Sequence, residues 1–167
     1  MKTILMMATT VNGMVANLRD ETPWSAEEFA NFETCVERYG NLIVGRRTIE
    51  IMAHQGELEL TKNAVIVVVS SKPPVVSGCL HVKTPKEALE LLKNKGFEVA
   101  MVGGGMKLNT AFLQEGLIDE LILDVEPFVF GNGIPLVDNI SLDLKLELLS
   151  CRLLNKSTVA LHYRILK

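Results

Sequence analysis

The sequence predicts an α/β fold built on a mostly parallel β-sheet. Short apolar segments rich in β-branched residues alternate with segments of helical periodicity, and no internal repeat or low-complexity stretch interrupts this order. Several of the apolar segments, such as residues 64–69, contain no polar position, which is typical of strands covered on both faces. Near the end of the chain, Leu144, Leu146 and Leu148 alternate with charged residues, which predicts an antiparallel strand pair that completes the sheet.

The expected elements follow in chain order. Strands are predicted at residues 3–8, 41–44, 64–69, 80–82, 98–102, 120–126 and 158–166. A helix over residues 25–39 is indicated by apolar residues three to four positions apart. A second helix begins at Thr84, where Thr-Pro-Lys-Glu is a capping box, and ends at Gly96. A third helix is expected directly after the glycines at 103–105.

The composition limits the possible functions. A chain of 167 residues, 48% hydrophobic and 22% charged, suits one globular domain over residues 1–167. The net charge of −3 argues against nucleic-acid binding through a broad basic face. Its apolar runs are too short for a secretion signal or a membrane span. The three cysteines and three histidines are widely separated, so we expect no disulfide framework, no metal site and a cytoplasmic location.

Three of the expected strands end in residues suited to a phosphate group. The glycines at 103–105 open a helix, where uncovered backbone N–H groups can approach an anion. Arg46 and Arg47 open another helix, where cations oppose the helix dipole unless an anion lies on them. Residues 70–72, Ser-Ser-Lys, follow a third strand. Together they predict a phosphorylated dinucleotide at the carboxyl edge of the sheet. The alternatives are a tight glycine turn and arginines that simply reach into solvent.

These segments together resemble the dihydrofolate reductase superfamily, which includes the reductase half of the bifunctional riboflavin deaminase/reductase. The resemblance covers nearly the whole chain and depends on the order and spacing of VGRRTIE, VSSKPP, MVGGGMKL and ELILDVEPFVFGNGIPLV. It implies a three-layer α/β/α fold with NADPH as the hydride donor. The residues implied to contact the cofactor are Ala8, Gly13, Gly45, Arg46, Arg47, Thr48, Ser70, Ser71, Lys72, Gly103, Gly104, Gly105, Met106 and Lys107.

The resemblance also implies a loop that closes over the nicotinamide ring. Residues 12–15 occupy this position, with Gly13 as a hinge, and Pro23 and Trp24 complete the loop. Trp24 and Phe32 are the implied substrate-binding residues. Without the resemblance, residues 12–15 are equally compatible with an ordinary turn, and Trp24 with a core position.

Glu28 is the expected proton donor, because the folate enzyme uses an acidic side chain on its first helix and the spacing from Glu28 to Phe32 matches. Asp124 corresponds to a threonine beside that acid, and a second carboxylate there would raise one of the two pKa values. An equally weighted alternative is structural, because Ser25 to Glu28 forms a capping box with Glu28 at its N3 position.

The substrate is less clearly indicated. Where the folate enzyme binds the glutamate tail with an arginine, this chain has Thr61 followed by Lys62, which weakens the folate interpretation. The loop at 127–136 resembles the P-x-x-x-G-x-G-I-P loop of the riboflavin-pathway reductase, but the helix at 27–37 is acidic and lacks that enzyme's basic pattern.

The sequence therefore predicts an NADPH-dependent reductase of a C=N or C=O bond in a small heterocycle. The riboflavin-pathway substrate 5-amino-6-(5-phosphoribosylamino)uracil is placed slightly ahead of dihydrofolate. An NADPH-binding module without catalysis is the alternative from a different functional class. The family further suggests a homodimer that forms through the antiparallel tail.

Overall fold

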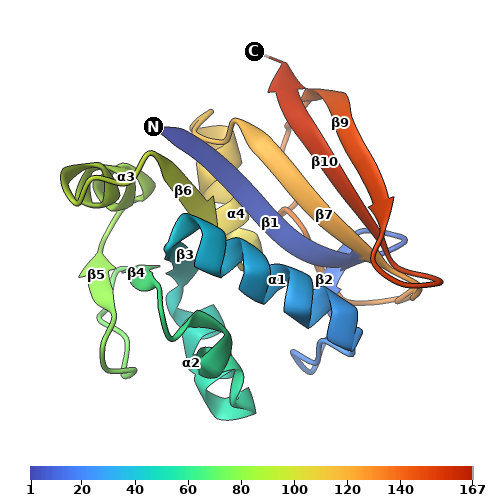
Figure 1. Cartoon of the computed structure of the whole chain (residues 1–167), viewed down its shortest axis with the longest axis horizontal. Helices are drawn as coiled ribbons and strands as arrows, with labels where there is room; N and C mark the ends of the chain where they lie inside the picture. Colours follow the sequence, from blue (N-terminus) through green and yellow to red (C-terminus); the bar gives the residue numbers. More distant parts are fainter. Residues whose placement is uncertain (167) are drawn as a thin grey trace.

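The computed structural model describes residues 1–166 and contains one large twisted sheet with helices on both faces (Figure 1). The strands of this sheet are β1 (Lys2–Thr10), β3 (Asn41–Gly45), β4 (Val65–Val69), β5 (Leu80–Val82), β6 (Val99–Val102), β7 (Glu120–Glu126), β9 (Lys145–Leu153) and β10 (Val159–Leu166). The helices are α1 (Ala26–Tyr39), α2 (Arg46–Gln55), α3 (Pro85–Asn94) and α4 (Met106–Gln114), with a short 3₁₀ turn at Glu57–Thr61.

Within the described residues the sheet has eight strands in the order β5-β4-β3-β6-β1-β7-β10-β9. All pairings from β5 to β7 are parallel, and β10 pairs antiparallel with both β7 and β9. The predicted mixed sheet with an antiparallel C-terminal pair is therefore confirmed. The last strand, β10, lies inside the sheet, and β9 forms its edge.

Two apolar cores lie on opposite faces of the sheet. One contains Ala88 and Leu92 of α3 with Leu108 and Phe112 of α4, all buried. The other contains buried side chains of α1 and α2, such as Val36. Figure 1 shows α1 crossing the front of the sheet and α4 behind it. This arrangement is the predicted three-layer α/β/α fold, and it explains why the central strands are apolar on both faces.

Most predicted element boundaries hold to within two residues, but β9 continues to Leu153, five residues beyond the alternating leucines, and there are two additions. A small second sheet pairs β2 (Met14–Ala16) with β8 (Ile134–Pro135), so the expected loop at 12–15 is part strand. The 3₁₀ turn after α2 was also not predicted. Both additions are too short to leave a periodic pattern in the sequence.

The parallel pairing brings the functional candidates together. Because the carboxyl ends of β1, β3, β4, β6 and β7 share one edge of the sheet, the segments that follow these strands are neighbours there. No helix within residues 1–166 is long and apolar enough to cross a membrane.

Candidate active site

Helices α2 and α4 start at this edge with glycine N-caps. Gly45 caps α2 and Gly105 caps α4, and neither helix has a side-chain hydrogen bond to its first N–H groups. The two starts touch, because the N–H of Gly45 donates a 2.8 Å hydrogen bond to the carbonyl of Gly104. Thr48 lies beside them, since a Cβ on Gly105 would be 3.1 Å from its Oγ1. Two positive helix ends therefore converge with uncovered donors.

The arginines of α2 have carboxylate partners. Arg47 forms an ion pair with Asp20, and Arg46 lies 3.6 Å from Glu50 on the same helix. The side chains of Arg47 and Arg46 are 76% and 45% exposed, so both guanidinium groups remain accessible. Such exposed pairs contribute at most about 1 kcal/mol each and do not prevent a phosphate from binding.

The glycines at 103–105 are required by the protein's own packing as well. A Cβ on Gly103 would lie 2.7 Å from Cδ1 of Leu42. Gly104 has φ of +89°, and a Cβ there would lie 2.7 Å from Sδ of Met7. The tight-turn alternative is thus correct for Gly104, and it does not exclude a cofactor above the turn.

The third predicted phosphate segment, residues 70–72, lies after β4. The hydroxyl of Ser70 donates to the carbonyl of Lys72, while Ser71 and Lys72 are exposed. The imidazole Nε2 of His81 lies 2.9 Å from the carbonyl oxygen of Ser70. Ser70 therefore shapes the turn, and Ser71 and Lys72 are the groups free to meet a ligand.

Three carboxyl groups are buried beside one another on the α1 face of the sheet. Glu28 of α1 is 4% exposed, and Asp124 and Glu126 of β7 are 0% and 1% exposed. Asp124 is paired in register with Ala8 of β1, so the predicted cofactor residue Ala8 lies beside the acid. The structure thus brings together Glu28 and Asp124, from positions 96 apart in the chain.

We define Glu28, Asp124 and Glu126 as the acid cluster, and burial raises the pKa of two of its members, Glu28 and Asp124. Desolvation, and then the charges of Asp124, Glu126 and Glu57, raise the pKa of Glu28 from 4.5 to about 8. Desolvation also raises the pKa of Asp124 to about 6, against the lowering effects of Asn31 and Arg152. At neutral pH the cluster therefore combines a protonated Glu28 with an ionised Asp124.

The capping interpretation of Glu28 is only half correct. The Oγ of Ser25 accepts a 3.2 Å hydrogen bond from the N–H of Glu28, as a capping box requires. The return bond is made by another residue, because the N–H and Oγ of Ser25 donate to Oε1 of Glu126 at 3.1 and 2.6 Å. Capping therefore explains the backbone position of Glu28 but not its buried carboxyl group.

An aromatic cluster that the sequence did not indicate lies next to the acids. The rings of Trp24, Phe128 and Phe130 have pairwise centroid distances of 6.2 Å, and Trp24 and Phe130 are nearly parallel at 15°. The amide group of Asn12 bonds to both the carbonyl and the N–H of Phe130, at 2.7 and 3.2 Å. The predicted nicotinamide loop and the loop after β7 are therefore joined.

The remaining predicted residues are spread around the same edge. Gly13 has φ of +84°, and its carbonyl accepts a hydrogen bond from the N–H of Leu136. Met106 and Lys107 lie in the first turn of α4, where Lys107 is exposed. Phe32 is half-buried and packs against the α1 and α2 core.

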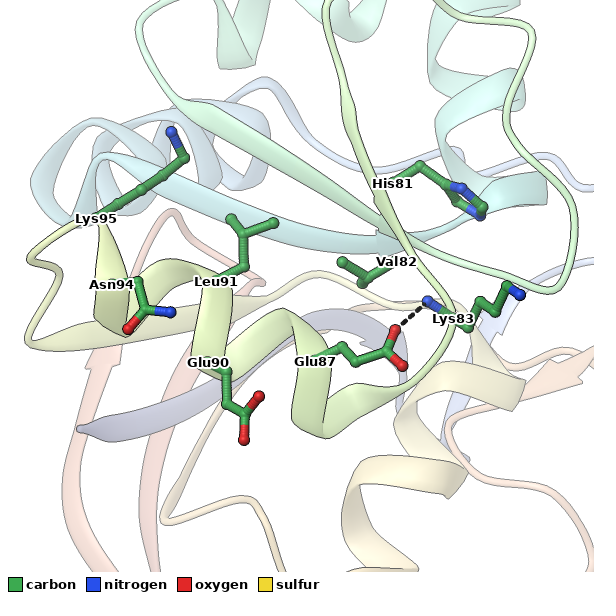
Figure 2. Close-up of a pocket in the computed structure, with 8 residues that line it drawn as sticks. All are labelled: His81, Val82, Lys83, Glu87, Glu90, Leu91, Asn94 and Lys95. Atoms are coloured by element: carbon green, nitrogen blue, oxygen red, sulfur yellow. Dashed lines mark hydrogen bonds between the residues drawn. The ribbon is translucent and has the colours of Figure 1, made fainter.

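Two surface hollows lie outside the acid cluster. One, with a volume of about 300 Å³, is lined by Arg47 together with Asp20 and Glu50. The other, of about 700 Å³, lies between residues 81–83 and one face of α3 (Figure 2). None of the predicted site residues lines the larger hollow, and both signs of charge are present around it.

Among residues 1–166, no three His, Cys, Asp or Glu side chains are arranged to hold a metal ion. The prediction that the protein uses no metal remains a prediction.

Solved structures share the fold of this chain. Dihydrofolate reductase from Enterococcus faecalis, solved with NADP(H) and RAB-propyl, matches with a TM-score of 0.75 at 17% identity, over 99% of this chain and 97% of that one. A putative riboflavin biosynthesis protein from Shewanella sp. PV-4 matches with a TM-score of 0.82 at 22% identity over 100% of both chains. This chain therefore has the fold seen in a dihydrofolate reductase, as the sequence resemblance implied.

The family can be stated more narrowly. The RibD C-terminal domain family matches residues 1–160, so this chain belongs to that family. Among curated proteins, the uncharacterized YwjB of Bacillus subtilis (strain 168) is 27% identical over 172 residues, which is 97% of each chain.

Proposed function

We propose that this protein is an NADPH-dependent reductase of a C=N or C=O bond in a small heterocycle, with 5-amino-6-(5-phosphoribosylamino)uracil as the leading substrate. The observation that carries the proposal is the pair of uncapped helix starts at the sheet edge, together with the buried carboxyl group of Glu28, whose pKa is raised to about 8. The first element suits a dinucleotide phosphate, and the second suits proton transfer to a reduced nitrogen or oxygen. Membership of the RibD C-terminal domain family supports the choice of substrate.

The residues at the sheet edge fit the cofactor. The uncovered N–H groups after Gly45 and Gly105 would receive the pyrophosphate, with Arg46 and Arg47 supplying bidentate contacts to phosphate oxygens. Exposed Ser71 and the other groups of the 70–72 turn would approach the 2′-phosphate. When bound there, NADPH supplies the hydride.

The acid cluster would supply the proton. Glu28 holds a proton at neutral pH because burial and the neighbouring carboxylates raise its pKa to about 8. A donor with this pKa is matched to a reaction near neutral pH. Ionised Asp124 would hold Glu28 in its protonated state and would polarise the bound ring.

The aromatic cluster would form one wall of the substrate site. Trp24 directly precedes Ser25 in the chain, and Phe128 follows Glu126 after one proline. The hydrogen bonds from Ser25 to Glu126 hold these two segments together. Phe128 is 36% exposed, so its ring can contact a planar ligand.

The first experiment is a side-by-side assay of NADPH consumption by the purified protein with the ribosylaminopyrimidine phosphate and with dihydrofolate. We expect turnover of the former. Binding of NADPH without consumption of either substrate would support the non-catalytic binding module, and failure to bind NADPH would reject the proposal.

Dihydrofolate is the second candidate. It is favoured by the buried acid on the first helix and by the fold match to the E. faecalis dihydrofolate reductase. Thr61, in the position expected for a tail-binding arginine, is 2% exposed and donates its hydroxyl to the carbonyl of Leu58, so it offers no charge to a glutamate tail.

We also propose that two copies pair through β9. All nine residues of this edge strand are exposed. The large apolar side chains exposed on β9, beside it and at the end of β10 are Leu144, Leu146, Leu148, Leu149, Leu153 and Leu166. An unprotected edge strand of this length normally requires a covering partner. A monomeric mass by light scattering at micromolar concentration would reject the pairing.

A further inference from the structure

Asp124 is held by two polar side chains whose role was not visible in the sequence. Nδ2 of Asn31, on α1, donates a 2.6 Å hydrogen bond to Oδ2 of Asp124. Oδ1 of Asn31 accepts a hydrogen bond from the guanidinium of Arg152, on β9. The Asn31 amide has its NH2 donor toward Asp124 and its oxygen acceptor toward Arg152, and only this orientation satisfies both neighbours. We call the chain of hydrogen bonds from Arg152 through Asn31 to Asp124 the relay.

The relay joins the outside of the protein to its interior. Arg152 belongs to the exposed edge strand β9, whereas Asn31 is 8% exposed and Asp124 is fully buried. Sequence separation does not hint at this arrangement, because Arg152 is 121 positions from Asn31. A cation at the edge of the sheet thereby acts on a carboxylate in the candidate active site.

The other oxygen of Asp124 is Oδ1. Oδ1 is buried and accepts no hydrogen bond from any residue that the structure describes. Leaving a buried acceptor unpaired is costly, and native proteins retain such groups mainly where a ligand, a water or a function uses them. Asp124 is therefore anchored through one oxygen and has the other available to a donor such as a protonated carboxyl group.

The titratable groups around Asp124 are mostly acidic. Glu28 approaches from α1, Glu126 lies two positions along β7, and Glu57 acts on Glu28 from the 3₁₀ turn. The thiol of Cys35 on α1 is also within the field of Asp124. Against these groups, Asn31 and the charge of Arg152 lower the pKa of Asp124. Burial has the largest effect on the pKa of Asp124, and Asn31 and then Arg152 are the groups that favour its ionised form.

We propose that Arg152, acting through Asn31, is a positioning residue that keeps Asp124 ionised and so leaves the proton of the buried pair on Glu28. Its catalytic consequence, that Glu28 is the donor, rests on the proposed reductase function. The assignment of protons within the pair does not depend on that function. Arg152 itself touches neither reacting group.

The test is a carbon-detected NMR titration of the side-chain carboxyl groups in the full chain without ligands. Arg152→Gln should move the Asp124 midpoint to higher pH and narrow its interval from the Glu28 midpoint. A shift of one pH unit from about 6 would lower the ionised fraction of Asp124 at pH 6 roughly fivefold. Arg152→Lys should restore part of the original midpoint, because it keeps the charge but loses the planar fork.

Arg164→Gln is the matched control. Arg164 lies on the neighbouring strand β10 and pairs with Glu147 at 2.9 Å, with both side chains about half exposed. This variant removes the same charge from a position in register with Glu120, at the other end of β7 from Asp124, and should leave the Asp124 midpoint unchanged. An unchanged midpoint in Arg152→Gln, or an equal shift in both variants, would overturn the inference.

A second variant and a second readout separate the possible failures. Asn31→Ala interrupts the relay while keeping the arginine, and it should also raise the Asp124 midpoint. In an active enzyme, the acidic limb of the pH profile of kcat should move to higher pH together with the Asp124 midpoint. A shifted midpoint in a protein that consumes no NADPH would uphold the relay and reject the proposed function.

Discussion

Helices α1 and α3 begin differently from helices α2 and α4. Ser25 and Thr84 cap α1 and α3 with side-chain oxygens, and both first turns contain glutamate. Glycines precede α2 and α4, with no side-chain cap and no acid in the first turn. In the first pair, the cap side chain accepts a hydrogen bond from one first-turn N–H, whereas in the second pair no side chain does so and these N–H groups are left for another acceptor. The uncapped pair is the one that meets at the carboxyl edge of the sheet, where an anion would bind.

The capped pair contains a second contrast. Glu28 and Glu87 occupy the same N3 position, and Oε2 of Glu87 accepts a 2.7 Å hydrogen bond from the N–H of Lys83, just before its helix. Glu126 has taken the equivalent place next to α1, so Glu28 is left buried with its proton. The same local sequence signature thus produces a cap in one helix and a candidate acid in the other.

The largest expected effect comes from Glu28→Gln, with Glu87→Gln as its matched control. Loss of a general acid should lower turnover about a hundredfold or more. Cofactor affinity should not change in either variant, and Glu87→Gln should keep full turnover. Steady-state NADPH consumption measures turnover, and a binding titration measures cofactor affinity. Equal losses of turnover in the two variants would contradict the assignment of Glu28, and not Glu87, as the acid.

Glu28→Gln should lower turnover but increase the stability of the fold. The pKa of Glu28 is raised on folding, so the native state binds more protons between pH 4.5 and about 8, and stability falls as pH rises through that window. Glu28→Gln removes this cost and should raise the unfolding free energy by on the order of 3 kcal/mol at pH 7. Denaturant melts at pH 5 and pH 8 would show it. A lower melting temperature with full turnover would instead mean that Glu28 is a structural cap.

Replacing both Arg46 and Arg47 with Ala should weaken the binding of NADPH by about 1.5–3 kcal/mol, because charge-assisted hydrogen bonds are lost. The loss of NADH affinity should be smaller if one of these arginines contacts the 2′-phosphate of NADPH. Lys86→Ala with Lys93→Ala removes two cations from the capped helix α3 and should change neither affinity. Calorimetric titrations with both cofactors decide the matter, and equal weakening of NADPH and NADH would reject a 2′-phosphate contact.

The two caps should differ in strength. Thr84→Ala should cost about 1 kcal/mol for the lost N-cap bond. Ser25→Ala should cost more, because its hydroxyl also donates a 2.6 Å bond to buried Glu126. Urea unfolding of the two variants compares them directly, and an equal cost would mean that Glu126 finds another partner.

The smallest expected effect on stability comes from converting an uncapped helix into a capped one. Gly45 has φ of −76°, and a Cβ there would meet nothing closer than 3.8 Å, so serine fits without strain. Gly45→Ser should stabilise the protein by a few tenths of a kcal/mol. It should also weaken the binding of NADPH, because the new hydroxyl competes with the cofactor phosphate for the same N–H groups. Tighter cofactor binding in this variant would show that the N–H groups of α2 are not the phosphate site.

Sequence patterns predicted elements better than they predicted partners. The strands at 80–82 and 120–126 and the capped starts at Ser25 and Thr84 were predicted as observed, because periodicity and capping depend on neighbours in the chain. The ion pair of Arg47 with Asp20 and the position of Phe128 were not predicted, because each involves groups brought together only by folding.

The sequence by itself determined the α/β alternation, the four helix starts and the glycines that mark the sheet edge. These features follow from local backbone preferences and from apolar periodicity. Only the tertiary structure decided that Glu126 replaces Glu28 in the capping box and that Arg152 reaches Asn31 and Asp124. Protonation of a carboxyl group depends on burial and on charges a few ångströms away, and no spacing along the chain encodes those distances.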